Sequence, residues 1–397
     1  MHRISIDDLC KDVNIVRKLL SRVFCAFAAL CTIFCTCPDA KADSLPSVSA
    51  KGAVVINAST GEVLYSHFAE KSLPMASTTK IMTTILAIEH GDLDSRFTVD
   101  PVAVRVEGSS MGLKENDKVT LRDLCYGMML PSGNDAANCT AVRVGGSIEN
   151  FVQLMNDKAK QLGLENTHFV TPSGLDDYTQ DHYSSALDMA RLTRYAMKNK
   201  EFRKICSAKS VKLSFGDPPY DRWLTNTNKL LKTCHGVIGV KTGFTDKAGR
   251  CLVSCCSRGG TELICVTLGD RNDWQDHSRL YDSCFPLVAR QELSCGTKGF
   301  VVNVAGGECD KIRCRIQPAY ACISKDSRDS VRSVVHLPMF VYATVKKGDA
   351  VGRVDFWYKG ELIAQSAIYA DEDCPLAKGQ DKGFVDKLKQ KLFLWLS

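Results

Sequence analysis

Three short motifs carry the side chains with the clearest chemistry in this chain. They are S-x-x-K at residues 77–80, S-x-N at residues 132–134 and K-T-G at residues 241–243. A serine hydroxyl is a weak nucleophile and needs a nearby base, which a lysine can supply. In this order, the three motifs are the parts of an active-site serine acyl-transferase. Each motif alone occurs often by chance, so the prediction of nucleophilic catalysis rests on their combination.

The first two motifs predict a nucleophile and its proton acceptor. Ser77 and Lys80 are three residues apart, so a helix would project both side chains from the same side of its first turn. Lys80 can act as a base only when it is neutral, and both burial and a second cation, Lys241, would lower its pKa. Ser132 could relay a proton between Lys80 and the leaving amine. Asn134 could hold Lys80 and bind a substrate amide.

The third motif predicts a binding site for a carboxylate. Lys241 offers a positive charge and Thr242 a hydroxyl, while Gly243 would let a substrate backbone approach closely. Taken singly, each motif also has a plain structural interpretation: an N-cap for the first, a turn for the second and the end of a strand for the third. None of the eight histidines lies in a catalytic motif, so His182 and the others are interpreted as surface or structural residues.

Periodic patterns predict the elements that must position these motifs. Apolar residues recur at helical spacing after Ser77, which predicts a buried helix over residues 77–90. Further helices are expected over residues 147–162 and 185–199, and a hairpin is expected over residues 52–57 and 63–65. Three neighbouring strands of one antiparallel sheet are expected over residues 237–240, 252–254 and 263–268, with Lys241 on the first.

The chain is long enough for two domains after its first segment. We expect an α/β (α+β) domain over residues 43–290, with helices around an antiparallel sheet. Residues 291–375 alternate apolar with polar positions, which predicts a small all-β sandwich or barrel without a chemical motif. Residues 376–397 are expected to form an amphipathic helix. At helical spacing, the apolar residues of this segment fall on one face, which ends in Trp395 and has several lysines beside it. A helix with such a face can lie in a lipid headgroup layer. The alternative is a tail helix that packs on the protein's own core.

Residues 1–42 read as an export signal. Arg17, Lys18 and Arg22 precede an apolar run from residue 23 to residue 37, and Ala40-Lys-Ala42 offers a cleavage site. The alternative is a cytosolic amphipathic segment. Fourteen of the 19 cysteines lie beyond this segment, which in an exported protein suggests disulfides of unknown connectivity. Cys255 and Cys256 are adjacent and are expected to point in different directions.

Charge and motif content exclude several classes of function. The net charge is +6, and its excess is concentrated at the C-terminus, where residues 378–397 hold five lysines and two aspartates. The body of the chain therefore offers no basic face for nucleic acid. There is no C-x-x-C or H-E-x-x-H motif, so neither a metal nor a cofactor is expected.

The chain resembles the low-molecular-mass penicillin-binding proteins that are D-alanyl-D-alanine carboxypeptidases. The resemblance covers residues 45–290 strongly and the rest more weakly. It extends beyond the three motifs to six longer stretches, which are Pro74-Met-Ala-Ser-Thr-Thr-Lys80, Leu130-Pro-Ser-Gly-Asn-Asp-Ala136, Leu162-Gly-Leu-Glu-Asn-Thr-His-Phe169, Tyr183-Ser-Ser-Ala-Leu-Asp-Met-Ala190, Asn226-Thr-Asn-Lys-Leu230 and Lys241-Thr-Gly-Phe-Thr-Asp-Lys-Ala-Gly249.

This resemblance implies a penicillin-binding or serine β-lactamase-like transpeptidase fold and a reaction on cell-wall stem peptides. Ser77 would attack the carbonyl between two terminal D-alanines, and water would release the acyl-enzyme. The backbone N–H groups of Ser77 and Phe244 would bind the oxyanion. Phe244 departs from the family, because some members have a histidine there. β-Lactams, which mimic the D-alanyl-D-alanine end, would acylate Ser77. The protein would lie at the periplasmic face of the bacterial inner membrane, held by its C-terminal helix.

Three rival functions stay open at this point. A DD-endopeptidase that cuts peptidoglycan crosslinks would use the same chemistry. A serine β-lactamase would need an efficient deacylating base, and no E-x-x-x-N motif follows Ser132 at the required spacing. A non-catalytic envelope scaffold is the third, and the intact motifs argue against it.

Overall fold

The computed structural model describes residues 45–176, 179–297, 299–325 and 330–378. The export signal predicted over residues 1–42 and the amphipathic pattern over residues 384–396 lie outside the described residues, so both stay predictions. In the described ranges, no helix is both long enough and apolar enough to cross a membrane.

A five-stranded antiparallel sheet lies at the centre of the part that carries the three motifs. Its strand order is β2-β1-β9-β8-β7, which places β7 and its K-T-G motif at an edge. The predicted hairpin and the three predicted neighbouring strands are confirmed. The strands are β1 (Gly52–Asn57), β2 (Val63–His67), β7 (Val237–Thr245), β8 (Gly249–Arg258) and β9 (Thr261–Leu268).

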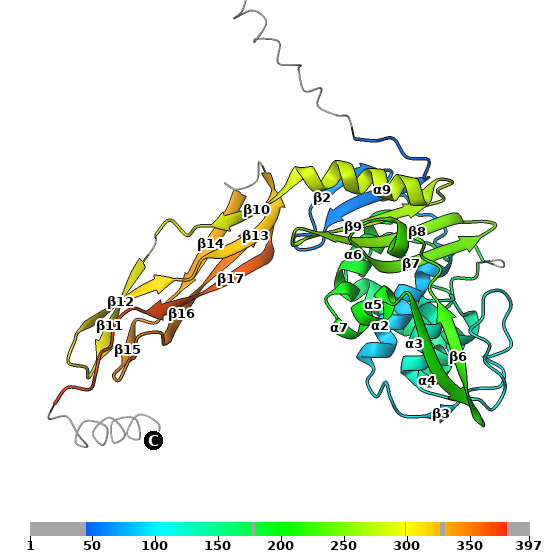
Figure 1. Ribbon diagram of the computed structural model, residues 1–397, viewed down its shortest axis with the longest axis horizontal. Coiled ribbons are helices and arrows are strands. Elements are labelled where there is room, and N and C mark those ends of the chain that lie inside the picture. Colours follow the sequence, from blue (N-terminus) through cyan, green and yellow to red (C-terminus); the bar gives the residue numbers. More distant parts are fainter. Residues whose placement is uncertain (1–44, 177–178, 298, 326–329, 379–397) are drawn as a thin grey trace, which may run out of the picture. The chain divides into compact units, whose positions relative to one another are not determined.

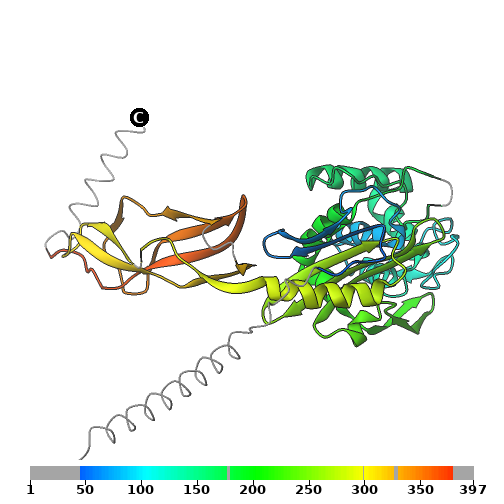
Figure 2. The ribbon, with the colours of Figure 1, turned by 90° about the horizontal axis from the view of Figure 1, so that it is seen from above.

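Helices cover both faces of this sheet (Figure 1). The helix α9 (Asp273–Cys284), the yellow-green helix in front of the sheet in Figure 2, packs on one face, and α2 (Lys80–Glu89) and α6 (Ala186–Met197) pack on the other. The remaining helical segments are η1 (Ala76–Thr79), α3 (Leu121–Met129), α4 (Asn134–Gly145), α5 (Ile148–Gln161), α7 (Lys200–Ser207), α8 (Leu230–Thr233) and η2 (Phe285–Leu287).

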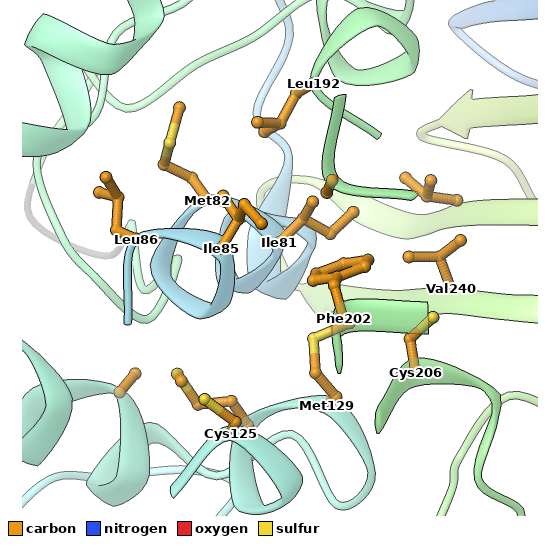
Figure 3. Packing of buried hydrophobic residues seen from close by; sticks show 14 of the residues in the cluster. Ile81, Met82, Ile85, Leu86, Cys125, Met129, Leu192, Phe202, Cys206 and Val240 are labelled. Carbon is orange, nitrogen blue, oxygen red and sulfur yellow. The ribbon is translucent and has the colours of Figure 1, made fainter. Parts of the chain in front are cut away.

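The helix α2 lies inside the larger hydrophobic core. Every residue from Lys80 to Ala87 is buried, so the rest of the fold covers this part of the helix on all sides. Ile81, Ile85 and Phe202 are among the side chains that meet there (Figure 3). The predicted buried helix is therefore confirmed, with one refinement: Ser77 lies in the 3-10 turn η1, and Lys80 begins the α-helix proper.

Two other predicted helices begin at serine caps. The Ser147 hydroxyl accepts the N–H of Asn150 at the start of α5, and the Ser185 hydroxyl accepts the N–H of Asp188 at the start of α6. Two short antiparallel pairs were not predicted. They are β3 (Phe97–Thr98) with β4 (Lys118–Val119), and β5 (Ser210–Gly216) with β6 (Pro219–Thr225).

The C-terminal part is all β, as predicted. A two-stranded sheet pairs β10 (Val288–Leu293) with β13 (Ala319–Ser324), and a six-stranded sheet has the order β14-β16-β17-β12-β11-β15. Its core includes Ile312, Phe356 and Ile368. The strands of the larger sheet are β11 (Gly299–Ala305), β12 (Lys311–Ile316), β14 (Val331–His336), β15 (Phe340–Tyr342), β16 (Ala350–Tyr358) and β17 (Glu361–Ala370). The domain boundaries themselves stay predictions.

One disulfide, Cys309–Cys374, lies in this β region, while the other cysteines of the described residues are free thiols. Cys255 packs in the core around α2, and Cys256 packs in the core beneath α9. The two adjacent thiols therefore point to opposite faces of the sheet, as expected.

Candidate active site

The first two motifs meet at the start of α2. The Nζ atom of Lys80 lies 2.8 Å from the Oγ atom of Ser77. It also donates to Asn134 Oδ1 at 2.7 Å and to the backbone carbonyl of Ser173 at 2.6 Å. Lys80 is fully buried, whereas Ser77 is only half-buried. The arrangement therefore joins an enclosed amine to a hydroxyl that a ligand can reach.

Unusual backbone conformations bring these groups together. Ala76, just before the nucleophile, has a φ of 49°, and Ser132, just before α4, has a φ of 70°. Both values are uncommon for residues with a side chain, and such strained positions cluster at functional sites. Asn134 is the first residue of α4, which fixes its amide against Lys80.

A glycine packs the loop that carries Ser173 against the nucleophile turn. A Cβ atom on Gly174 would lie 2.0 Å from the carbonyl oxygen of Ala76, and the φ of Gly174 is +88°. Only glycine fits this position without a shift of the backbone. This close packing is what brings the carbonyl of Ser173 within reach of the Lys80 amine.

The edge strand β7 forms the other side of the site. A Cβ atom on Gly243 would lie 3.0 Å from the backbone nitrogen of Ser77, so β7 packs directly against η1. Lys241 is buried, and its Nζ donates to the carbonyl of Thr242 at 2.7 Å. The Thr242 hydroxyl pairs with the hydroxyl of Thr227 at 2.8 Å. The Phe244 ring is 63% exposed.

Burial changes the charge state of both lysines. It lowers the pKa of Lys80 well below its ordinary value, and the positive charge of Lys241 lowers it further, while Asp135 acts weakly in the opposite direction. Burial also lowers the pKa of Lys241 to about 7. The lowered pKa of Lys80 suits a base, and Lys241 can bind a carboxylate at pH values where it is charged.

The structure brings most of the predicted site residues together. Ser77, Lys80 and Asn134 are in contact, and Gly243 lies against the backbone of Ser77. Ser132 is buried beside this group, but within the described residues its hydroxyl makes no hydrogen bond to Lys80 or to any other residue. In the same ranges, no group of three or more His, Cys, Asp or Glu side chains could hold a metal ion.

Several contributors to the site were missed from the sequence. The carbonyl of Ser173 has no side-chain signature, so no motif could reveal it. Asp135 directly follows the S-x-N motif, and its buried carboxylate accepts the N–H groups of Met111 and Leu113. Thr227, the partner of Thr242, lies in a stretch, Asn226-Thr-Asn-Lys-Leu230, that already resembles the family.

Comparison with known families agrees with this geometry. A family model described as D-alanyl-D-alanine carboxypeptidase matches residues 39–272. A second model, described as the C-terminal domain of penicillin-binding protein 5, matches residues 301–376. Together the two models cover the motif-bearing part and the all-β part of the chain.

Individual relatives match over most of their length. The chain is 32% identical over 374 residues to the D-alanyl-D-alanine carboxypeptidase DacF of Bacillus subtilis (strain 168), covering 90% of this chain and 92% of that protein. It is 30% identical over 213 residues to a D-alanyl-D-alanine endopeptidase of Escherichia coli (strain K12), covering 53% and 68%.

A solved structure has the same architecture. Penicillin-binding protein 5 from Haemophilus influenzae is similar with a TM-score of 0.61 and 27% identity, over 84% of this chain and 99% of that one. The fold and the site thus define a serine peptidase of the penicillin-binding class. The chain belongs to the D-alanyl-D-alanine carboxypeptidase family of low-molecular-mass penicillin-binding proteins, and the predicted folds of its two domains and the predicted hydrolase activity are confirmed.

Proposed function

We propose that Ser77 is the nucleophile that removes the terminal D-alanine from peptidoglycan stem peptides, with Lys80 as its base. Ser77 Oγ attacks the carbonyl between the two D-alanines, its proton passes to Lys80, and the C–N bond breaks as the terminal D-alanine leaves. Water then hydrolyses the ester on Ser77. Donation of a proton to the departing amine falls to Lys80, with Ser132 as the relay.

The observation that carries this proposal is the set of oxygens around the Lys80 amine. A neutral amine has two N–H donors and one lone pair. The oxygens of Asn134 and Ser173 accept two hydrogen bonds, at 2.7 Å and 2.6 Å. The lone pair is then left for the Ser77 hydroxyl, 2.8 Å away. A base needs this distance and this lowered pKa to remove a proton.

The remaining motif residues bind the substrate in this proposal. Lys241 attracts the terminal carboxylate, and Thr242 offers it a hydroxyl. The N–H groups of Ser77 and Phe244 stabilise the oxyanion. Since Phe244 contributes only its backbone there, its departure from the histidine of some relatives would alter substrate and β-lactam handling more than the acylation itself.

Mass spectrometry tests the nucleophile directly. Native protein treated with benzylpenicillin should gain the mass of one penicillin, and peptide mapping should place it on the peptide that holds Ser77. Heat-denatured protein treated in the same way is the matched control and should gain none. An adduct on another residue, or none on the native protein, would overturn the assignment. Rapid hydrolysis of the penicillin without a lasting adduct would favour the β-lactamase alternative.

A second candidate function is cleavage of crosslinks, because one similar protein is a D-alanyl-D-alanine endopeptidase. Purified muropeptides with and without crosslinks distinguish the two activities. Release of free D-alanine from uncrosslinked pentapeptides is expected. Conversion of crosslinked dimers to monomers at a higher kcat/KM would instead make the endopeptidase activity the main one.

We propose further that the protein is exported and held at the periplasmic face of the inner membrane by its C-terminal segment. The support is the sequence of residues 1–42 and of residues 384–396, each described above. Removal of residues 378–397 should move the protein from the membrane pellet to the soluble fraction. Unchanged sedimentation would contradict the anchor.

A further inference from the structure

A buried histidine that takes no part in the mechanism above lies close to the nucleophile turn. His182 is fully buried in the segment that precedes α6, outside the three motifs. Its Nδ1 atom accepts the backbone N–H of Val170 at 3.0 Å. In a neutral imidazole only one nitrogen carries hydrogen, so the hydrogen of His182 is on Nε2.

The ring stays neutral under ordinary conditions. Burial lowers the pKa of His182 to about 3, and a positive charge on His168, Lys247 or Lys80 would lower it further. The Nε2 atom lies 2.8 Å from the hydroxyl oxygen of Thr79. Because Nε2 carries the hydrogen, His182 donates this bond and Thr79 accepts it.

The hydroxyl of Thr79, which accepts from His182, donates in turn to the backbone. A hydroxyl has a single hydrogen, and Thr79 uses it to donate to the carbonyl of Ala76 at 2.8 Å. Three groups, His182, Thr79 and the Ala76 carbonyl, therefore form a chain of hydrogen bonds with one possible direction.

The last hydrogen bond in this series sets the orientation of the backbone N–H of Ser77. The carbonyl of Ala76 and the N–H of Ser77 belong to one planar peptide group, so holding one orients the other. This peptide follows a residue with a φ of 49°, which few alanines adopt without support. It lies between Gly174, which faces the Ala76 carbonyl, and Gly243, which faces the Ser77 nitrogen.

We propose that His182 and Thr79 are positioning residues that hold the Ala76–Ser77 peptide so that the Ser77 N–H points at the oxyanion. The inference rests on the oxyanion role proposed above for that N–H. Neither side chain touches the substrate. Their effect is on the transition state, because a preorganised donor acts most where the negative charge develops.

Two substitutions of the same histidine separate this role from a merely structural one. In His182→Gln the amide nitrogen takes the place of Nε2 and can still donate to Thr79. In His182→Asn the shorter amide can accept from Val170 but does not reach Thr79. A positioning role therefore requires Gln to keep activity and Asn to lose it. A role limited to holding the loop at Val170 requires the reverse.

The measurement is the rate of Ser77 acylation by benzylpenicillin, expressed per molecule that the drug can label, together with kcat and KM on a D-Ala-D-Ala peptide. We expect His182→Asn and Thr79→Val to lower the acylation rate and kcat by about 10-fold to 100-fold, with KM within about twofold. His182→Gln and Thr79→Ser should stay within about threefold of the wild type. The double variant His182→Asn/Thr79→Val should acylate no more slowly than Thr79→Val alone, because both substitutions break the same series of hydrogen bonds.

A second buried histidine provides the matched control. His277 lies on the buried face of α9, is equally buried, and contacts the hydroxyls of Ser254 and Thr267 at 2.7 Å and 3.1 Å. His277→Asn should lower thermal stability yet keep the wild-type acylation rate per labelled molecule. A wild-type acylation rate in His182→Asn, or equal losses of rate in His182→Gln and His182→Asn, would overturn this inference and leave the proposed function standing. Absence of any Ser77 adduct in the wild type would overturn the proposed function together with it.

Discussion

Two buried polar clusters lie on opposite faces of the central sheet, and they differ in what they leave within reach of a ligand. On the face of α2, the amine of Lys80 joins Asn134, Ser173 and the half-buried Ser77. On the face of α9, His277 joins Ser254 and Thr267, and Ser254 also pairs with the hydroxyl of Tyr281 at 2.6 Å.

Burial lowers a pKa in both clusters. It brings the pKa of His277 to about 3 and that of Lys80 well below its ordinary range. Yet every member of the His277 cluster is buried and paired, so it joins α9 to the sheet and nothing more. A shifted pKa therefore does not by itself identify a catalytic group. The catalytic group is identified by the accessible hydroxyl of Ser77 beside the Lys80 amine, whose pKa is lowered.

The largest expected effect compares one serine from each cluster. Ser77→Ala removes the nucleophile, so we expect kcat to fall by at least about 10⁴-fold and penicillin labelling to disappear. Ser254→Ala removes a buried hydrogen-bonding partner and should cost about 1–3 kcal/mol of stability while leaving kcat within about twofold. Steady-state kinetics and thermal unfolding of both variants check this. Comparable losses of kcat in the two variants would contradict the assignment of catalysis to the Ser77 cluster alone.

The next effect concerns the base. Lys80→Met fills the same space without a lone pair, so we expect kcat to fall by about 10²-fold to 10⁴-fold. The binding of penicillin before acylation should change far less, because Lys80 lies beneath Ser77. Stopped-flow measurement separates the binding step from the acylation step. A variant that acylates at the wild-type rate would show that another group takes the proton.

A smaller effect is expected in the pH profile. The pKa of Lys241 in the folded protein is about 7, so its charge is present below that pH and is lost as the pH rises through it. The attraction for a substrate carboxylate should therefore weaken above about pH 7, and kcat/KM should fall by no more than about tenfold per pH unit. The acidic limb belongs to Lys80, since protonation removes its lone pair.

Lys241→Arg tests this assignment. Arginine stays protonated throughout the accessible range, so the alkaline fall should disappear even if the overall rate is lower. The shape of the profile is the measurement, recorded from pH 5 to pH 10. An alkaline limb that persists in the variant would assign that titration to another group.

The smallest effect on activity is expected in the β region, which carries none of the three motifs. Replacing Cys309 and Cys374 together by alanine removes the disulfide and should lower the stability of this part by about 2–4 kcal/mol. The kcat should stay within about twofold. Cys314→Ala, a buried free thiol in the same core, is the matched control. A large loss of kcat in the disulfide variant would show that the β region acts on catalysis.

The sequence predicted those parts of the site that local spacing determines. Ser77 and Lys80 share one turn, and the apolar residues after them predicted the buried helix that holds them. The strands of the sheet followed from β-branched apolar runs such as residues 263–268. The rest of the site depends on tertiary contacts: the carbonyl of Ser173 reaches Lys80 only because Gly174 packs against Ala76.

Several elements escaped prediction for a related reason. The helix α4 (Asn134–Gly145) is built largely from small and polar residues, so its sequence has little apolar periodicity. Its buried face becomes evident only beside α3 and α5. His182 was interpreted as surface or structural because nothing in its neighbourhood marks a buried imidazole, and its partners, Thr79 and Val170, come from distant segments.

The three oxygens around Lys80 have a consequence for the cost of proton transfer. An ammonium has three N–H bonds, and three oxygens lie within 2.8 Å of this nitrogen. When the proton arrives from Ser77, the same three atoms can accept all three bonds, so Lys80 keeps the partners that it already has. The same three oxygens can therefore serve both forms of the base, so a repeated step of the reaction needs no exchange of hydrogen-bonding partners, although burial still favours the neutral form.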